Sequence, residues 1–445
     1  MTEPRPKKQR LQCEYIIPNK KRRCGMTRPS NEESKHVRYC LEHRHLLGVD
    51  ASAGAVTDSR KRVPCPLDPN HTIWEFELAK HLQKCNKRKV LHSNDGEVYY
   101  KENHNAGVYS EQGDEEKSNL SLQDCILSTL NILKDFNKEN EIVIPKLIKH
   151  SGIMEDKRFP QLDENDNIGR KYHAIQQSSL IQNMFDHNIL TSASNSNFIE
   201  FGCGRAELSR YINQVNQYTT DTDNSTSHFV LIDRSTNRMK FDAKIMADSE
   251  EINSVRSNNN KPQIDRIRID IKDLDITPVL KSNEKYIAIS KHLCGVATDL
   301  ALRCLIGHEK ELREDHLQGI CIAMCCRHVC NHNSYINPSY IKHILQNHSA
   351  GETLTYSQFF LALTKIAPWA TSGKAGTGDQ AQTHFSKLNE QERFNAGIQA
   401  RNIIDQGRAD WLESRLDEKT FGVKLIRYCE SEVTLENNAI LVYRI

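Results

Sequence analysis

NFIEFGCGRAELS, residues 197–209, is the segment that indicates the fold most directly. A short apolar run ends at Gly202 and Gly204, and a helix-like pattern begins directly after them. This order predicts a parallel β-strand that turns tightly into a helix, because glycine lets the backbone bend sharply and approach a nucleotide-like ligand closely. The helix that follows would direct its free N–H groups at the same ligand.

A second apolar run, residues 229–232, ends at Asp233. An acid in this position suits the two hydroxyl groups of a ribose. The glycine loop reads EFGCGRA, with Glu200 before the first glycine, and lacks the full GxGxxG pattern. In this respect it resembles S-adenosylmethionine methyltransferases more than dehydrogenases. Glu200, Gly202, Gly204 and Asp233 are therefore expected to bind that cofactor; the alternatives are an ordinary turn and an ordinary strand-end acid.

The remaining apolar segments predict an α/β sheet of the doubly wound type. Strands are expected at residues 266–273, 286–290 and 319–324, an antiparallel hairpin at 424–429 and 439–443, and packing helices around 126–133 and 175–185. Asp270 lies on the third strand, and we expect it at the adenine end of the cofactor. The alternative for Asp270 is a solvated strand-end acid.

Candidate catalytic groups follow the fourth and fifth strands. Lys291 and His292 come directly after the fourth strand, and His328 comes shortly after the fifth. The carboxyl ends of strands face the ligand crevice in doubly wound sheets, so these side chains could accept a proton or stabilise a developing anion. Lys291 ranks first, because burial beside a cationic cofactor would lower its pKa. The alternative role for Lys291 is a phosphate contact.

The segment CCRHVC, residues 325–330, also has the composition of a metal site. Adjacent cysteines point in opposite directions when the backbone is extended, however, and thiols are common in strand cores. We therefore expect these cysteines to line the pocket and not to bind a metal.

The first metal-binding pattern lies near the N-terminus, with the spacing C-x10-C-x15-C-x2-H: Cys13, Cys24, Cys40 and His43. Three thiolates and one imidazole satisfy a tetrahedral zinc ion. His36 and His45 are alternative fourth ligands. Unrelated buried cysteines are the other interpretation, but the region has few large apolar residues, and a metal would compensate for the missing core.

A second pattern follows with the spacing C-x5-H-x9-H-x3-C: Cys65, His71, His81 and Cys85. His81 and Cys85 are four residues apart, so on a helix they share one face and can hold one ion. Trp74, Phe76 and Leu78 supply a small core. The pattern resembles the CHHC finger of spliceosomal and tRNA-methylating proteins. We expect one structural zinc ion in each of the two fingers.

Composition sets the limits of the remaining interpretation. The chain has 445 residues, 38% hydrophobic and 27% charged, so one large domain and small modules are expected. The predicted divisions are a CCCH finger at 1–50, a CHHC finger at 60–90, a linker at 91–118 and the methyltransferase domain at 119–445. No apolar run approaches a membrane span, and no signal-peptide core is visible, so we expect a cytoplasmic or nuclear protein. The fourteen cysteines then suggest metal sites or buried thiols, and the basic N-terminal region suggests a polyanionic partner.

The chain resembles one family over nearly its whole length. The resemblance rests on five features in this order: the two fingers, EFGCGRAELS, SKHLCGVATD and MCCRH. The family is the eukaryotic tRNA 2′-O-methyltransferase family that modifies the fourth nucleotide of the acceptor stem. The resemblance implies a class I (Rossmann-like) methyltransferase fold, S-adenosylmethionine as cofactor, and the acceptor stem of tRNAs, including glycine, histidine or proline species, as substrate. It implies neither a membrane nor an obligate protein partner.

Two other functions remain open on the sequence. The first is methyl transfer to a different acceptor, a base nitrogen or a protein. The second is a non-catalytic RNA-binding protein that uses the CHHC finger, with the sheet as a scaffold. The glycine loop together with Asp233 favours an enzyme over the second alternative.

Overall fold

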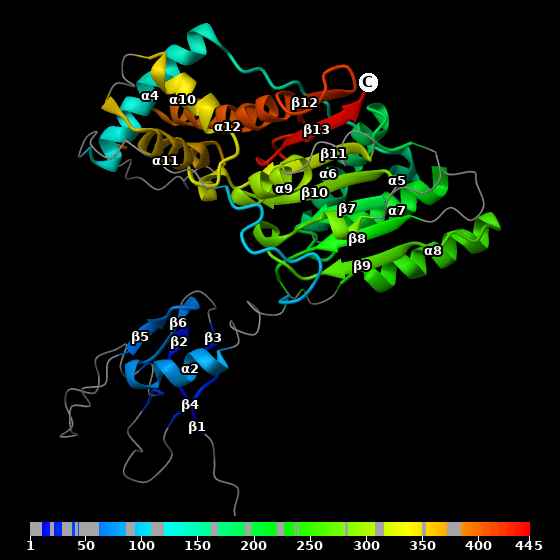
Figure 1. Cartoon of the computed structure of the whole chain (residues 1–445), viewed down its shortest axis with the longest axis horizontal. Coiled ribbons are helices and arrows are strands. Elements are labelled where there is room, and N and C mark those ends of the chain that lie inside the picture. The colour runs from blue at the N-terminus through cyan, green and yellow to red at the C-terminus, as the bar shows by residue number, and fades with distance from the viewer. Residues whose placement is uncertain are drawn as a thin grey trace, which may run out of the picture. The chain divides into compact units, whose positions relative to one another are not determined.

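The computed structural model describes residues 11–17, 22–28, 38–40, 43, 62–85, 94–107, 120–161, 168–191, 197–219, 227–235, 237, 240–280, 284–307, 316–348, 353–371 and 384–445. The chain divides into two compact units, Met1–Ser93 and Asn94–Ile445 (Figure 1). Among the described residues, no helix is both long and apolar enough to cross a bilayer.

The larger unit is built on a seven-stranded sheet with the strand order β12-β13-β11-β10-β7-β8-β9 (Figure 1). The strands are β7 (Asn197–Phe201), β8 (His228–Ile232), β9 (Gln263–Ile267), β10 (Tyr286–Cys294), β11 (Leu317–Cys325), β12 (Phe421–Arg427) and β13 (Asn438–Arg444). The five strands from β7 to β11 run parallel, whereas β13 is antiparallel to both of its neighbours. All five parallel strands therefore bring their carboxyl ends to the same edge.

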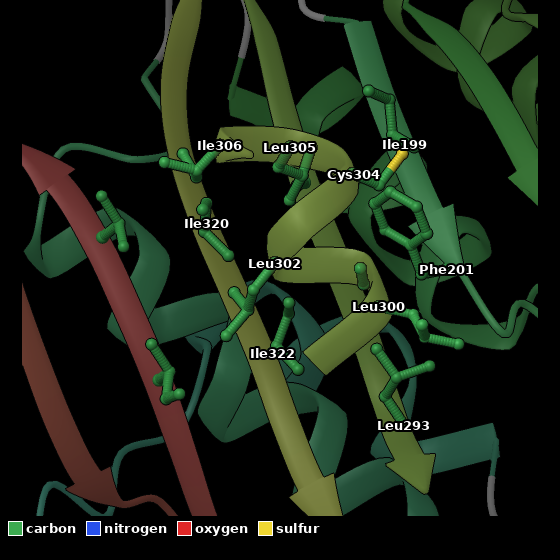
Figure 2. Close-up of a cluster of buried hydrophobic side chains, with 14 of the residues drawn as sticks. Ile199, Phe201, Leu293, Leu300, Leu302, Cys304, Leu305, Ile306, Ile320 and Ile322 are labelled. Carbon is green, nitrogen blue, oxygen red and sulfur yellow. The ribbon is translucent and has the colours of Figure 1, made fainter. Parts of the chain in front are cut away.

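Helices pack against both faces of the sheet: α6 (Ile168–Asp186) and α7 (Glu207–Thr219) on one face, and α9 (Val296–Ile306) and α12 (Glu390–Glu413) on the other. The other helices of this unit are α4 (Leu122–Glu139), α5 (Gly152–Lys157), α8 (Asp242–Arg256), α10 (Pro338–Gln346) and α11 (Tyr356–Ile366). Because side chains alternate along a strand, Phe198 joins the apolar cluster with α6 and α7, while Ile199 and Phe201 join the one with α9. Figure 2 shows this second cluster, in which α9 packs over the strands.

A third cluster lies among α4, α10, α11 and α12. It includes Phe359 and Phe360 of α11 and Ile403 and Ile404 of α12, all buried. Of these helices, the sequence patterns above predicted α4 and left α10 and α11 without an assignment. The third cluster gives the larger unit a helical part in addition to the sheet.

The third strand differs from its predicted position. β9 is Gln263–Ile267, whereas the alternating pattern had suggested residues 266–273. Ile267 pairs with Ile232, the last residue of β8, so the ladder ends there. Ile269 and Ile271 continue the alternation because they are buried in the core, without a partner strand. Asp270 therefore lies beyond the strand and not within it.

Residues 94–107 fell within the predicted linker, yet they pack on the sheet unit. Tyr100 forms a bridge with Leu274. The fully buried Asn105 donates through its amide group to the carbonyl oxygens of Ile271, at 2.6 Å, and Leu274, at 2.7 Å. Since these bonds satisfy buried backbone carbonyls, this segment is part of the larger unit.

The smaller unit consists of short elements. These are β1 (Leu11–Gln12), β2 (Ile16–Ile17), β3 (Arg22–Arg23), β4 (Thr27–Arg28), β5 (Arg62–Cys65), β6 (Asp68–Trp74), η4 (Glu75–Glu77) and α2 (Leu78–Lys84). β1 pairs with β4, β2 with β3, and β5 with β6, all antiparallel. Two-stranded ribbons of this length are not stable alone in water.

Candidate active site and metal centres

The glycine loop between β7 and α7 is held in an unusual backbone conformation. Gly202 has φ +61° and Gly204 φ +51°, values that favour glycine. The Gly204 N–H donates to Asp233 Oδ2 at 2.8 Å, which ties the loop to the end of β8. A Cβ atom on Gly204 would meet no atom within 4 Å, so there is open space beside this residue.

Glu200 is buried in β7 directly before the loop. Its carboxylate accepts a hydrogen bond from Ser209 Oγ of α7 at 2.5 Å. Burial raises the pKa of Glu200 to about 7, although this hydrogen bond opposes the shift. The side chain therefore joins the strand to the first turns of the helix behind the glycines.

The two acids expected at the cofactor occupy different settings. Asp233 is half-buried, and its two oxygens accept from the Gly204 N–H and the Ser235 N–H. Asp270 accepts from the Lys272 N–H and caps the 3-10 helix η6 (Ile271–Asp273). It also lies 3.9 Å from the Arg234 guanidinium, on the turn that follows Asp233. Asp233 is thus joined to the glycine loop directly, whereas Asp270 lies on the connection after β9 and reaches the turn after Asp233 through Arg234.

Lys291 and His292 lie in an extension of β10 that the sequence patterns did not predict. The pairing with β11 shifts register between Lys291 and Leu293, and His292 has φ +62°. Such a bulge turns side chains away from the regular alternation of a strand. Lys291 Nζ lies 2.6 Å from Nδ1 of His173, and His292 Nε2 lies 2.9 Å from Oε1 of Gln176.

Burial lowers the pKa values of Lys291, His292 and His173. It lowers the pKa of Lys291 to about 8, partly offset by Glu207 and Glu200. It also lowers the pKa of His292 to about 4, with the Lys291 charge acting in the same direction. The pKa of His173 is lowered by burial and then by Lys291. Near neutral pH His292 is therefore uncharged, the neutral form of His173 is favoured, and Lys291 exists in both forms.

His328 has a different environment from Lys291 and His292. It is exposed in the short 3-10 helix η8 (Arg327–Val329), on the loop after β11. The residue of η8 that the structure buries is Arg327, whose guanidinium pairs with Asp405 at 2.6 Å and with Glu436. Sequence reasoning missed His173 and Gln176 of α6, because that helix carried only a packing pattern.

The first metal-binding pattern forms a compact group: Cys13, Cys24, Cys40 and His43. Their ligand atoms all lie within 4.8 Å of one another. His43 Nδ1 is 3.5 Å from Cys13 Sγ and 3.2 Å from Cys40 Sγ. Zinc–sulfur bonds of about 2.3 Å place tetrahedral ligands ~3.8 Å apart, so small shifts would accommodate an ion. The alternative ligands His36 and His45 lie outside the described residues.

The second pattern brings together Cys65, His81 and Cys85. The two sulfur atoms are 3.9 Å apart, and His81 Nε2 lies 3.3 Å from Cys65 Sγ. His81 lies in α2 and Cys85 caps its end, as their spacing predicts. The remaining expected ligand, His71, lies in β6, and its side chain is outside the described residues. The three described ligands have the donor types and spacing of a zinc finger.

Comparison with protein families gives three matches along the chain. Residues 175–443 match Methyltransferase TRM13, residues 11–44 match the CCCH zinc finger in TRM13 protein, and residues 62–86 match the U11-48K-like CHHC zinc finger. The matches to the two fingers contain both of the cysteine and histidine groups described above.

Individual relatives agree with these matches. The tRNA:m(4)X modification enzyme TRM13 of Vanderwaltozyma polyspora is 54% identical over 99% of this chain and 100% of its own. The enzyme of the same name from Saccharomyces cerevisiae is 43% identical over 98% of this chain and 96% of its own. The crystal structure of small RNA methyltransferase HEN1 covers 60% of this chain and 25% of its own at 13% identity, and its TM-score of 0.23 is too low to inform the fold.

Proposed function

Because the chain belongs to the TRM13 methyltransferase family, we propose that it methylates the ribose 2′ oxygen of nucleotide 4 in the acceptor stem of tRNA. The family resemblance drawn from the sequence motifs is confirmed, and the chain is a methyltransferase. Its relatives are named tRNA:m(4)X modification enzymes, which supports tRNA as the substrate. We extend the proposal to tRNAs of the glycine, histidine and proline types and to a cytoplasmic or nuclear site of action.

The sheet order supports a class I methyltransferase fold as part of this proposal. β7, β8 and β9 extend from the middle of the sheet to one side, and β10, β11 and the antiparallel β13 extend to the other. The strand order thus reverses between β7 and β10, and a ligand binds at the carboxyl edge of such a switch point. The glycine loop after β7 and Lys291 on β10 flank that position.

The residues at this edge fit S-adenosylmethionine. Gly202 and Gly204 would border its amino-acid part, because the open space beside Gly204 allows close approach. Asp233 would accept from the ribose hydroxyls, with Asp270 toward the adenine. Glu200 would act mainly by holding β7 and α7 together behind the loop. When bound, the cofactor supplies an electrophilic methyl group, so the protein has mainly to align a weak nucleophile.

Lys291 is our candidate for the group that receives the proton of the ribose hydroxyl. A neutral amine is required for this role, and the lowered pKa of Lys291, about 8, makes the neutral form a minor but populated species near physiological pH. His173 would orient the amine through the 2.6 Å contact, and Gln176 would hold His292 beside it. His328, exposed on another loop, ranks behind both Lys291 and His292.

The zinc fingers would bind the acceptor stem. Two structural zinc ions, one per finger, would stabilise elements too short to fold by burial alone. A-form RNA hides its major groove, so contacts to phosphates and to the shape of the helix should dominate. Binding should therefore weaken steeply as the salt concentration rises.

The proposal is tested with two synthetic tRNAs that differ only at nucleotide 4, one with ribose and one with 2′-deoxyribose. The purified full chain and S-adenosylmethionine with a labelled methyl group should label the first tRNA and leave the second unlabelled. Equal labelling of both would show that a base or another ribose is the acceptor. A lack of label in either, from protein that binds the cofactor, would favour a non-catalytic RNA-binding role.

A further inference from the structure

Three cysteines gather at the carboxyl ends of β10 and β11, outside the residues assigned above to the cofactor and to the zinc fingers. Cys294 and Cys325 are register partners on these neighbouring strands, and their sulfur atoms lie 2.7 Å apart. Cys326 completes the group, and all three sulfur atoms lie within 4.8 Å of one another. Cys294 is exposed, whereas Cys325 is buried.

The backbone explains why two adjacent cysteines can face the same point. In an extended chain the side chains of Cys325 and Cys326 would point apart and could not share a metal. Cys326 instead has φ +51°, in the left-handed region that non-glycine residues rarely adopt. This turn brings its thiol beside that of Cys325. A conformation of this kind is retained only where the surroundings enforce it, and such positions cluster at functional sites.

The same turn separates the group from the other members of the CCRHVC segment. Cys330 is buried, and its sulfur accepts a hydrogen bond from the Arg408 guanidinium at 3.3 Å. His328 is exposed on η8. The residue that joins Cys325 and Cys326 comes instead from β10, 31 positions before Cys325. No pattern within one segment reveals this set of three.

We propose that Cys294, Cys325 and Cys326 bind one thiophilic divalent cation of the zinc type, in addition to the ions of the two fingers. Three thiolates form three sides of a tetrahedral site, and each thiol releases its proton as the metal binds. The sulfur atoms of Cys294 and Cys325 separate from 2.7 Å to ~3.8 Å, the spacing of ligands on one zinc ion. A water molecule on the exposed side of Cys294 completes the coordination.

The alternative to a metal site is a disulfide between Cys294 and Cys325, the two closest of the three thiols. It would leave Cys326 without a role, although the left-handed turn at Cys326 is what brings the third thiol into the group. A metal uses all three thiols and links the ends of two central strands. The third thiol therefore favours the metal over the disulfide.

The test measures zinc in the full-length protein, purified without chelator, by elemental analysis. Cys294→Ala and Cys326→Ala should each contain one zinc ion fewer per chain than the parent protein. Cys321→Ala is the matched control, because Cys321 lies buried on the same strand, β11, outside the group. It should keep the parental content. Equal zinc in all four proteins would overturn the proposal.

A thiol titration of the denatured parent protein, with chelator present, distinguishes the disulfide. The metal site predicts the same number of reactive thiols with and without prior reduction. Two additional thiols after reduction, which are not gained by Cys294→Ala, would assign the pair to a disulfide and overturn the metal site. Neither readout depends on methyl transfer, so the outcome is separate from that of the tRNA experiment.

Discussion

The two units of the chain obtain their stability in different ways. In the first finger, the buried cluster consists of Cys13, Cys24 and Cys40, with Tyr15 and Tyr39 packed against it. The larger unit has three extensive apolar clusters, two of them on opposite faces of a seven-stranded sheet. A small module can thus depend on a metal for its fold, while a large domain can rely on burial of apolar side chains and tolerate charged groups in its interior.

Charged groups in the larger unit are buried together. Arg408 lies 2.7 Å from Asp299 and 3.5 Å from Asp405, and all three side chains are fully buried. Asp405 also pairs with Arg327 at 2.6 Å. This network joins α12 to α9 and to the loop after β11. A buried pair adds little compared with apolar packing, but losing one partner is costly because it leaves a charge unpaired.

The largest expected effect is the loss of the folded fingers when zinc is removed, while the larger unit stays folded. Chelation should abolish the fold of the fingers, because binding free energy is folding free energy in such modules. Amide exchange should become fast in peptides from residues 11–28 and 62–85, and stay slow in β7 and β8. Persistent protection of the finger peptides in metal-free protein would show that burial alone holds them and would remove the contrast.

A substitution in the buried network should destabilise the larger unit alone. Arg408→Met should lower its free energy of unfolding by about 3–5 kcal/mol, since Asp299 lies unpaired in the interior afterward. Urea denaturation measures the change, and the zinc content of the fingers should not alter. Lys138→Met is the control, because Lys138 forms an exposed pair with Asp135, and its effect should stay within about 0.5 kcal/mol. Equal effects of the two substitutions would contradict a special role for the buried charges.

The chemistry should belong to the sheet unit. Lys291→Ala should lower turnover about a hundredfold at saturating tRNA, with nearly unchanged tRNA affinity. Lys291→Arg is the informative control, since an arginine keeps the positive charge and does not act as a base. If Lys291 accepts the proton, both variants should turn over slowly. If Lys291 instead contacts a phosphate, the arginine variant should remain active, and the alanine variant should have a raised Michaelis constant for tRNA.

The dependence of turnover on pH is a second test of Lys291 as the proton acceptor. A lysine accepts a proton only when neutral, and its neutral fraction rises with pH through its pKa. The turnover of the parent protein should therefore rise up to about pH 8, the lowered pKa of Lys291, and level off above it. A profile that is flat from pH 6 to pH 9 would assign the proton transfer elsewhere.

The smallest effect concerns the boundary between the units. A chain that begins at Asn119 lacks every contact of residues 94–107, including the two hydrogen bonds from Asn105 to buried carbonyls, and a chain that begins at Asn94 keeps them. At about 1 kcal/mol for each bond, the loss of these two bonds alone should lower the free energy of unfolding of the shorter chain by about 2 kcal/mol, as measured by urea denaturation. If both chains have the same stability, residues 94–107 act only as a connector.

Much of the sheet could be predicted because its signals are local. The apolar runs before Gly202 and Asp233 are strands, and the last two apolar segments became β12 and β13. The position of β9 was not predictable, because Ile269 and Ile271 keep the alternating pattern after pairing has stopped. Alternation reports burial, and only the partner strand decides whether buried residues form a ladder.

The residues of the site could be predicted only where they lie together in one segment of the sequence. Lys291 and His292 stand out in sequence, but His173 lies 118 residues before Lys291 and came from a helix with an ordinary packing pattern. The buried charges were equally hidden, because an arginine on a polar helix such as α12 is usually solvated. Adjacent cysteines were judged by the geometry of a strand, which ends at Cys325.

The order of strands has a consequence for how the chain folds. Ile320 of β11 pairs with Val442 of β13, and the helices from α10 to α12 lie between them in sequence. Contacts at such long separation in sequence form slowly, because a large loop must close before they form. During synthesis, β11 therefore has one unpaired edge until β13 has been made. The strand is rich in β-forming residues. An unpaired edge of this kind can associate with another chain, so this stage of folding is the one most exposed to aggregation through the sheet.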